Sequence, residues 1–239
     1  MKRTVLITGA ARRIGKAIAH ALASAGWDIV IHAHRSAAQA ETLCADLAAS
    51  CGARAWPVAG DLGTADGAGA VFDAALSRAG RIDALVNNAA IFGRQPLAAA
   101  TAADFERHWR INTLAPILLT QRLARHVAER GAQGAVVNLL DQRVVRPCAD
   151  AVPYLLSKVT LEAFTRSAAL GLAQTVRVNA VAPGAVLLPV DAAASEPAGA
   201  FPLDTRPRPE AVADAVRYLL DADAITGQTL FVDSGQHLL

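Results

Sequence analysis

The segment Thr8-Gly9-Ala10-Ala11-Arg12-Arg13-Ile14-Gly15 decides the fold that we expect for this chain. It follows a short β-branched, apolar run at residues 4–8 and leads into an alanine-rich helical pattern that continues to Ala25. A glycine-containing turn between a buried strand and a helix is typical of the first unit of a doubly wound fold. The G-x-G-x-x-G spacing is absent, so the position of the turn supports the prediction more than its glycines do.

Strand and helix patterns alternate along the rest of the chain. Apolar runs predict strands at residues 28–32, 53–58, 84–87, 135–140, 177–181 and 229–232, and helical patterns lie between them, notably at 36–50, 104–129, 152–173 and 209–220. Strands without a polar face are covered by helices on both sides. We therefore predict an α/β fold: one domain over residues 1–239, a Rossmann-type, doubly wound parallel sheet with helices on both faces.

Composition excludes several classes of protein. The chain is 53% hydrophobic and 18% charged, which indicates a folded domain and not a disordered one. A net charge of +2 without a basic stripe argues against nucleic acid as a partner. The first apolar run ends at Gly9, too early for a signal peptide or membrane span. Three cysteines without a CxxC pair predict a cytoplasmic protein with reduced thiols, and we expect no metal site.

The glycine turn has the properties of a phosphate-binding site. Gly9 permits a tight turn, and Gly15 allows the helix to pack closely against the strand. Free amides at a helix N-terminus bind the pyrophosphate of a dinucleotide. The expected ligand crevice lies at the carboxyl ends of the strands, and residues 190–208, long and irregular, are predicted to form a substrate loop beside it.

The end of the second predicted strand selects the cofactor. NAD sites place an acidic residue there to bind the adenosine ribose. This chain has His34, Arg35 and Ser36 instead, and the next carboxylate is Glu41. A guanidinium binds a 2′-phosphate through charge-assisted hydrogen bonds, and Ser36 and His34 add further donors. The sequence therefore predicts NADPH/NADP+ over NAD.

Tyr154 and Lys158 form a Y-x-x-x-K pair in a predicted helix. A spacing of four places both side chains on one face of the helix. A nearby ammonium and an oxidised nicotinamide are expected to lower the tyrosine pKa towards the working range, so that Tyr154 transfers a proton. The pair is weak evidence alone, and its place after the turn and Arg35 strengthens it.

Across nearly its whole length the sequence resembles the short-chain dehydrogenase/reductase family. The matching landmarks, in chain order, are Thr8-Gly9…Gly15, Asp61-Leu62, Asn87-Asn88-Ala89, Asn112, Tyr154…Lys158, Asn179 and Pro183-Gly184. The resemblance implies that Thr8, Gly9, Arg12, Arg13, Ile14 and Gly15 bind the cofactor. It implies further cofactor contacts at Asp61, Leu62, Asn88, Ala89, Pro183 and Gly184. Asn112 would help to hold a water relay behind the Tyr–Lys pair, and a homotetramer is expected.

Two departures from the family pattern point to its pteridine reductase branch, which includes dihydromonapterin reductases. Asp141 stands thirteen positions before Tyr154, where most members have serine, and no Ser or Thr occurs between Gln121 and Leu156. Arg13 replaces the middle glycine of the turn. Phe92, shortly after Asn-Asn-Ala, is similar to a phenylalanine of that branch. The resemblance implies that Phe92 stacks on a pterin and that Arg13 bridges cofactor phosphate and substrate.

Three functions stay open at this point. The first is NADPH-dependent reduction of a ring C=N bond in dihydromonapterin, dihydrobiopterin or dihydrofolate. Asp141 would orient Tyr154 or a water that delivers the proton, if the closed site raises the pKa of Asp141. The second is reduction of a small ketone or a 3-oxoacyl thioester, which the missing serine disfavours. The third is a non-catalytic NADPH-binding sensor, which the intact Tyr154 and Lys158 disfavour. Arg143 and Arg146 are expected to be solvated at the surface, and Cys148 to be incidental.

Overall fold

A computed structural model describes residues 2–187 and 200–239. Within these residues, parallel strands form a seven-stranded sheet in the order β3-β2-β1-β4-β5-β6-β7. The strands are β1 (Thr4–Ile7), β2 (Asp28–Ala33), β3 (Ala55–Ala59), β4 (Ala84–Asn87), β5 (Gly134–Leu139), β6 (Val176–Pro183) and β7 (Thr229–Val232). The winding reverses between β1 and β4, and such a reversal opens a crevice at the carboxyl ends of the two strands.

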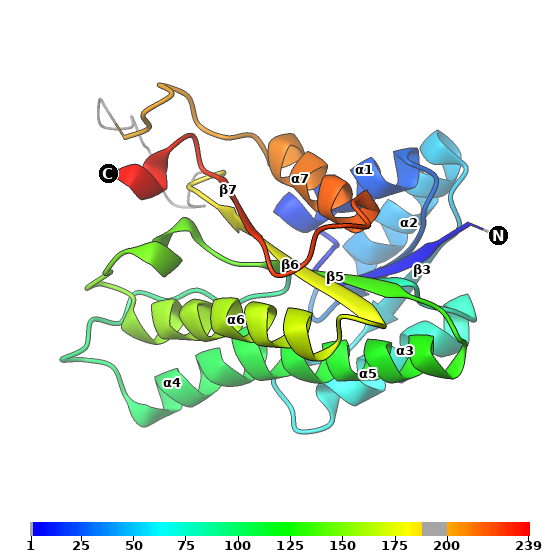
Figure 1. Ribbon diagram of the computed structural model, residues 1–239, viewed down its shortest axis with the longest axis horizontal. Coiled ribbons are helices and arrows are strands. Elements are labelled where there is room, and N and C mark those ends of the chain that lie inside the picture. Colours follow the sequence, from blue (N-terminus) through cyan, green and yellow to red (C-terminus); the bar gives the residue numbers. More distant parts are fainter. Residues whose placement is uncertain (1, 188–199) are drawn as a thin grey trace.

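Helices cover both faces of the sheet (Figure 1). They are α1 (Arg13–Ser24), α2 (Ala37–Cys51), α3 (Gly67–Ala79), α4 (Ala102–Trp109), α5 (Ala115–Glu129), α6 (Val152–Gly171) and α7 (Pro209–Asp221). Leu6 and Ile7, adjacent in β1, belong to different core clusters: Ile7 packs under α1, α2 and α7, and Leu6 under α3, α5 and α6. Both side chains are fully buried, which explains the unbroken apolar runs. The predicted doubly wound fold is confirmed.

The helix predicted at residues 104–129 is wrong in one respect, because it is interrupted. A π-helical turn, Arg110–Leu114, separates α4 from α5. Pro116 has no N–H to donate to the carbonyl of Asn112 four residues earlier, so regular helical bonding cannot pass through this point. Wide turns of this kind often occur at functional sites. Here the turn carries Asn112, which is fully buried.

The predicted substrate loop, residues 190–208, lies largely outside the described residues. Its described part, 200–208, is irregular and leads into α7. No described helix is long and apolar enough to cross a membrane. Residues 2–187 and 200–239 also contain no cluster of three or more His, Cys, Asp or Glu side chains suited to a metal ion.

Candidate active site

The glycine turn packs too tightly for side chains at its two glycines. Gly9 has a φ of +62°, a left-handed conformation that favours glycine. A Cβ atom on Gly15 would lie 2.5 Å from the Gly9 carbonyl oxygen and 2.7 Å from Nδ2 of Asn88. The roles predicted for both glycines agree with this geometry.

Buried polar side chains hold the turn behind the cavity. Oγ1 of Thr8 accepts hydrogen bonds from the backbone N–H groups of Asn88 and Ala89, each at 3.0 Å. The N–H of Gly9 donates to Nδ1 of His32 at 3.2 Å, so the His32 Nε2–H faces the Gly60 carbonyl at 3.1 Å. Burial lowers the pKa of His32, which keeps Nδ1 available as an acceptor. Thr8 therefore shapes the turn and does not line the cavity.

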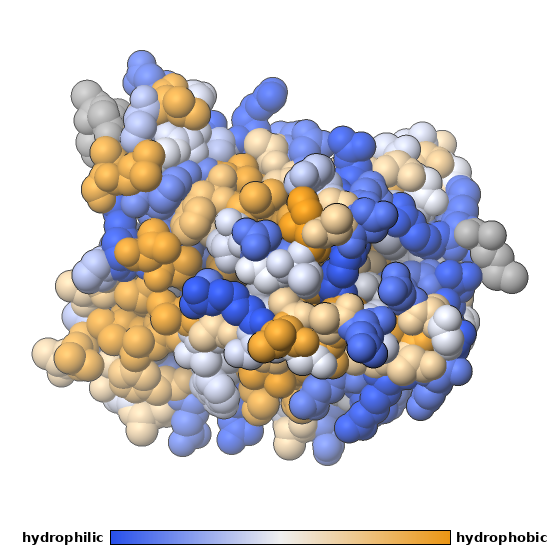
Figure 2. Space-filling model, in the orientation of Figure 1, coloured by the Kyte–Doolittle hydropathy of each residue, from blue (hydrophilic) through white to orange (hydrophobic). Residues whose placement is uncertain are grey.

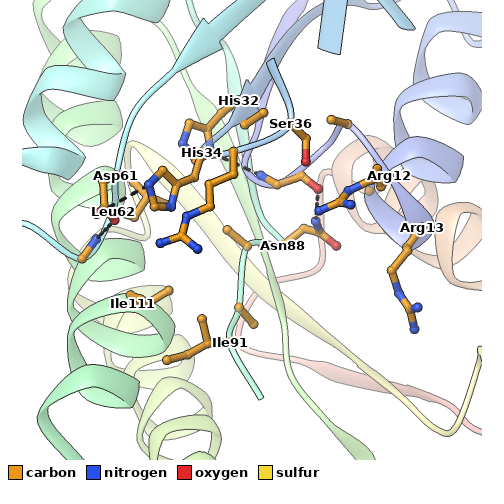
Figure 3. A pocket seen from close by; sticks show the side chains of 18 of the residues that line it. Arg12, Arg13, His32, His34, Ser36, Asp61, Leu62, Asn88, Ile91 and Ile111 are labelled. Carbon is orange, nitrogen blue, oxygen red and sulfur yellow. Dashed lines mark hydrogen bonds and ion pairs between the residues drawn. The ribbon is translucent and has the colours of Figure 1, made fainter. Parts of the chain in front are cut away.

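A cavity of about 730 Å³ lies in front of this turn, at the reversal of the sheet (Figure 3). Most of the predicted cofactor residues line it: Gly9, Arg12, Arg13, Ile14, Gly15, His34, Arg35, Ser36, Asp61, Leu62, Asn88 and Ala89. Thr8, Pro183 and Gly184 are not among its walls. Gly184 instead packs against Asp233, where an added Cβ would lie 2.7 Å from the Asp233 Cβ.

The charges around the cavity suit an anionic dinucleotide. The first turn of α1 has neither an acidic residue nor a side-chain cap among the described residues, so its amides remain available to phosphate. Arg12 and Arg35 are exposed at the rim, and Arg35 forms no ion pair with any described residue. His34 lies 3.7 Å from Asp61. These residues fit the cofactor that the sequence predicts.

Tyr154 and Lys158 lie one turn apart in α6, as predicted. Nζ of Lys158 donates to the Leu139 carbonyl at 2.7 Å and lies 6.0 Å from the centre of the Tyr154 ring. Burial lowers the pKa of Lys158 to about 8. Burial and the charge of Asp141 raise the pKa of Tyr154 well above its usual value. The Tyr154 phenol therefore keeps its proton here, and the lowering of its pKa by a bound oxidised nicotinamide stays a prediction.

Asp141 receives the Tyr154 hydroxyl, which donates to Oδ2 at 3.0 Å. Arg143 also binds this carboxylate, through Nε and Nη2 at 3.0 Å each. Burial raises the pKa of Asp141, but the hydrogen bonds and the charge of Arg143 outweigh burial and hold it below its ordinary value. The expected raised pKa of Asp141 is therefore wrong, and Asp141 is an anion.

Phe92 stands beside this pair with 53% of its surface exposed. Its ring meets the Tyr154 ring edge to face at 4.9 Å, and the Arg143 guanidinium lies 5.4 Å from its centre. An aromatic ring of this exposure leaves a face free for a planar ligand. Arg13 is placed differently: Figure 3 shows its side chain pointing away from the group formed by His34, Ser36 and Asn88.

Asn112 connects the cavity to the chemical centre. Its Oδ1 accepts from the N–H of Ile91 at 2.9 Å, and Ile91 lines the cavity. Its Nδ2 donates to Oγ of Ser157 at 3.0 Å, between Tyr154 and Lys158. Asn112 thereby fixes α6 against the cavity wall. Whether it also holds a water relay stays a prediction.

Sequence reasoning missed three residues that shape the site, namely Arg143, Arg146 and His32. Arg143 is not solvated at the surface, because its side chain is only 25% exposed and is bound to Asp141. Arg146 likewise donates to the Gln236 and Leu239 carbonyls, which ties the 142–146 turn to the C-terminal segment. The available signal for Arg143 was its position two residues after an acid that ends a strand. For His32, the signal was a histidine directly after the apolar run at residues 29–31.

The fold, the glycine turn and the Tyr–Lys pair together define a dinucleotide-binding oxidoreductase. A family model described as enoyl-(acyl carrier protein) reductase matches residues 9–237. The chain belongs to the short-chain dehydrogenase/reductase family.

Similar proteins include members of the predicted branch. Pteridine reductase 1 of Leishmania tarentolae is 35% identical, over 98% of this chain and 96% of its own length. A putative ketoacyl reductase of granaticin polyketide synthesis from Streptomyces violaceoruber is equally identical over the same shares. The crystal structure of alternative dihydrofolate reductase 1 from Brucella canis, complexed with NADP, is 36% identical with a TM-score of 0.90 and covers 99% of this chain and 95% of that one.

Proposed function

We propose that this protein reduces a ring C=N bond of a pterin with NADPH. The observation that carries the proposal is the 3.0 Å hydrogen bond from Tyr154 to Asp141, an anion where most of the family has serine. The similarity to pteridine reductase and to alternative dihydrofolate reductase supports it. Dihydromonapterin, dihydrobiopterin and dihydrofolate are the candidate substrates.

Different residues of the cavity would bind different parts of the cofactor. The α1 amides and Arg12 would hold the pyrophosphate, and Arg35 with Ser36 would hold the 2′-phosphate. Asp61 and Leu62 would border the adenine. Asn88 and Ala89 would border the part of the cofactor that extends towards Tyr154. The bound cofactor supplies the hydride. NADPH is preferred because the chain has no acidic residue between the end of β2 and Glu41 to repel a 2′-phosphate.

The charge of Asp141 favours a C=N bond over a ketone. Reduction of a ketone builds negative charge on oxygen, and an adjacent carboxylate opposes that charge. A ring nitrogen that is being protonated carries positive charge, which the carboxylate stabilises. Tyr154 holds the proton to be delivered. Its hydroxyl donates to Asp141 before transfer, and this hydrogen bond breaks when the proton passes to the ring nitrogen. The half-exposed ring of Phe92 gives the pterin a surface for stacking.

The protein is expected to act as a cytoplasmic homotetramer. Trp109 of α4 and Leu156 and Val159 of α6 are 42%, 50% and 37% exposed on neighbouring surfaces. Figure 2 shows apolar side chains gathered over the first turns of α6. Burial of such side chains against another subunit is favourable, which supports assembly through these helices.

A substrate panel tests the proposed activity. The purified protein is mixed with NADPH and offered the three dihydropterin-type substrates and an acetoacetyl thioester in parallel, while absorbance at 340 nm reports cofactor oxidation. Turnover of a pterin substrate with little thioester turnover is expected. Turnover of the thioester alone would support the second candidate, a ketoacyl reductase, which the streptomycete relative favours. No turnover of any substrate would support a cofactor-binding sensor.

A further inference from the structure

The carboxylate of Asp141 has no lone pair left for a substrate. Oδ1 accepts from the backbone N–H of Arg143 at 2.9 Å and from its Nε at 3.0 Å. Oδ2 accepts from Nη2 of Arg143 and from the Tyr154 hydroxyl, both at 3.0 Å. A carboxylate offers about four acceptor positions, and all four are used. Direct contact with a substrate would require one of these bonds to break.

Arg143 supplies three of the four bonds and is itself held in place. Its guanidinium lies 5.4 Å from the Phe92 ring centre and 5.6 Å from that of Tyr154. Its Nη1 points at the sulfur of Cys148 at 3.7 Å. Both members of the Arg143–Asp141 pair are mostly buried, with side chains 25% and 15% exposed. Loss of one partner from such a pair leaves an uncompensated charge, which is strongly destabilising.

The other charged groups near the pair come from two places. Nζ of Lys158 of α6 lies 6.0 Å from the Tyr154 ring centre, and its charge interacts with that of Asp141. Asp150 accepts a hydrogen bond from the Cys148 thiol at 2.9 Å and forms an ion pair with Arg94 at 2.6 Å. Phe92 contributes no charge. Arg143 is therefore the cation in direct contact with Asp141 among the described residues.

We infer that Arg143 is a positioning residue that holds Asp141 as an anion aimed at Tyr154, so that Asp141 acts on the substrate only through the Tyr154 hydroxyl. The inference rests on the proposed function only for the identity of the atom that Tyr154 protonates. The arrangement itself is the same for any substrate that this site reduces. It narrows the expectation that Asp141 orients Tyr154 or a water to Tyr154 alone.

The test compares R143M, which removes the charge, with R143K, which keeps it, and with the double variant D141N/R143M. Thermal unfolding is measured from pH 5 to pH 8, without substrate. R143M is expected to lower Tm by at least ~5 °C at pH 7. The loss should shrink at pH 5, because an unpaired buried carboxylate has a raised pKa and is neutralised as pH falls. D141N/R143M should regain most of the loss, and R143K should lie between.

A matched control and a kinetic readout complete the experiment. R94M breaks an exposed arginine–aspartate pair, with side chains 72% and 51% exposed, and should lower Tm by less than ~2 °C at every pH. In the wild type, kcat/KM should stay level from pH 7 to pH 5, whereas in R143M it should fall over that range as Asp141 gains a proton.

The inference would be overturned if R143M lowered Tm equally at pH 5 and pH 7 and D141N did not restore it. Arg143 would then contribute only by packing. If R143M does not fold, Tm is compared for R143K, D141N and D141N/R143K instead. If the effects of the two substitutions on Tm simply add, the inference is overturned. Failure of the wild type to reduce any pterin contradicts the proposed function alone, because the unfolding measurements need no substrate.

Discussion

We expect Arg35 to decide cofactor preference, because it follows β2 and has no partner among the described residues. Replacement by alanine removes a charge-assisted contact to the 2′-phosphate, so Arg35→Ala should weaken NADPH binding ~10- to 100-fold and NADH binding little. Quenching of protein fluorescence by each cofactor measures the two affinities. Arg12→Ala, in the phosphate-binding turn, is the matched control and should weaken both alike. Equal weakening of both cofactors by Arg35→Ala would contradict the 2′-phosphate assignment.

Lys158 should set the alkaline limit of the reaction. Burial lowers the pKa of Lys158 to about 8, and the charge of Asp141 raises it in partial compensation. As pH rises through about 8, the ammonium is lost and no longer stabilises the negative charge that Tyr154 gains on giving up its proton. The pH profile of kcat/KM should therefore fall on the alkaline side with a midpoint near 8.

The variant Asp141→Asn tests whether the charge of Asp141 raises the pKa of Lys158 and so the pH of the alkaline fall. Without the carboxylate, the pKa of Lys158 drops further, so the alkaline fall should move to lower pH, and kcat should decrease by ~10²-fold because Tyr154 is no longer oriented. Initial rates between pH 6 and pH 10 measure both changes. Asp150→Asn, at an exposed carboxylate near the same loop, is the control and should leave the profile in place. A shift to higher pH in Asp141→Asn would be inconsistent with this electrostatic arrangement.

The turn between β1 and α1 shows how an element fixes the site. A methyl group on Gly15 would overlap the Gly9 carbonyl and Nδ2 of Asn88. Gly15→Ala should therefore destabilise the protein by ~1–3 kcal/mol and weaken NADPH binding, because backbone atoms must move. Gly171→Ala, in α6 with nothing within 4 Å of its added Cβ, should be neutral or stabilising by up to ~1 kcal/mol. Urea unfolding and cofactor titration compare the two, and equal effects would exclude the steric explanation.

The sequence predicts elements better than it predicts contacts between them. Every predicted strand is present within a few residues. The central strands are buried on both faces and leave unbroken apolar runs, whereas the edge strands β3 and β7 are mostly half-buried. The break at Arg110–Leu114 was missed although Pro116 marks it, since the apolar pattern continues across it. The pairing of Arg143 with Asp141 was missed for another reason. Both residues lie in one short loop, and only the fold decides that this loop turns inward towards α6.

At the scale of the whole molecule, the fold and the cavity follow from the order of strands and helices. Reversal of the sheet between β1 and β4 places twelve predicted cofactor residues around one cavity, although they lie in segments far apart in the chain. The electrostatic state of the centre does not follow from that order. The pKa direction of Asp141 depends on Arg143 outweighing burial, and that of Tyr154 depends on burial and on Asp141. Neither burial nor these contacts are visible in a linear pattern.

Assembly is the property of the whole molecule that one substitution can test. Leu156, half exposed, lies in an apolar groove with Phe105, Trp109 and Pro153 between α4 and α6. If subunits meet there, Leu156→Glu buries an unpaired charge in the interface and should convert tetramers to smaller species. Light scattering after size-exclusion chromatography measures the mass. Ala45→Glu adds the same charge to an exposed position of α2 and should leave the mass unchanged. A tetramer that survives Leu156→Glu would place the subunit contacts on another face.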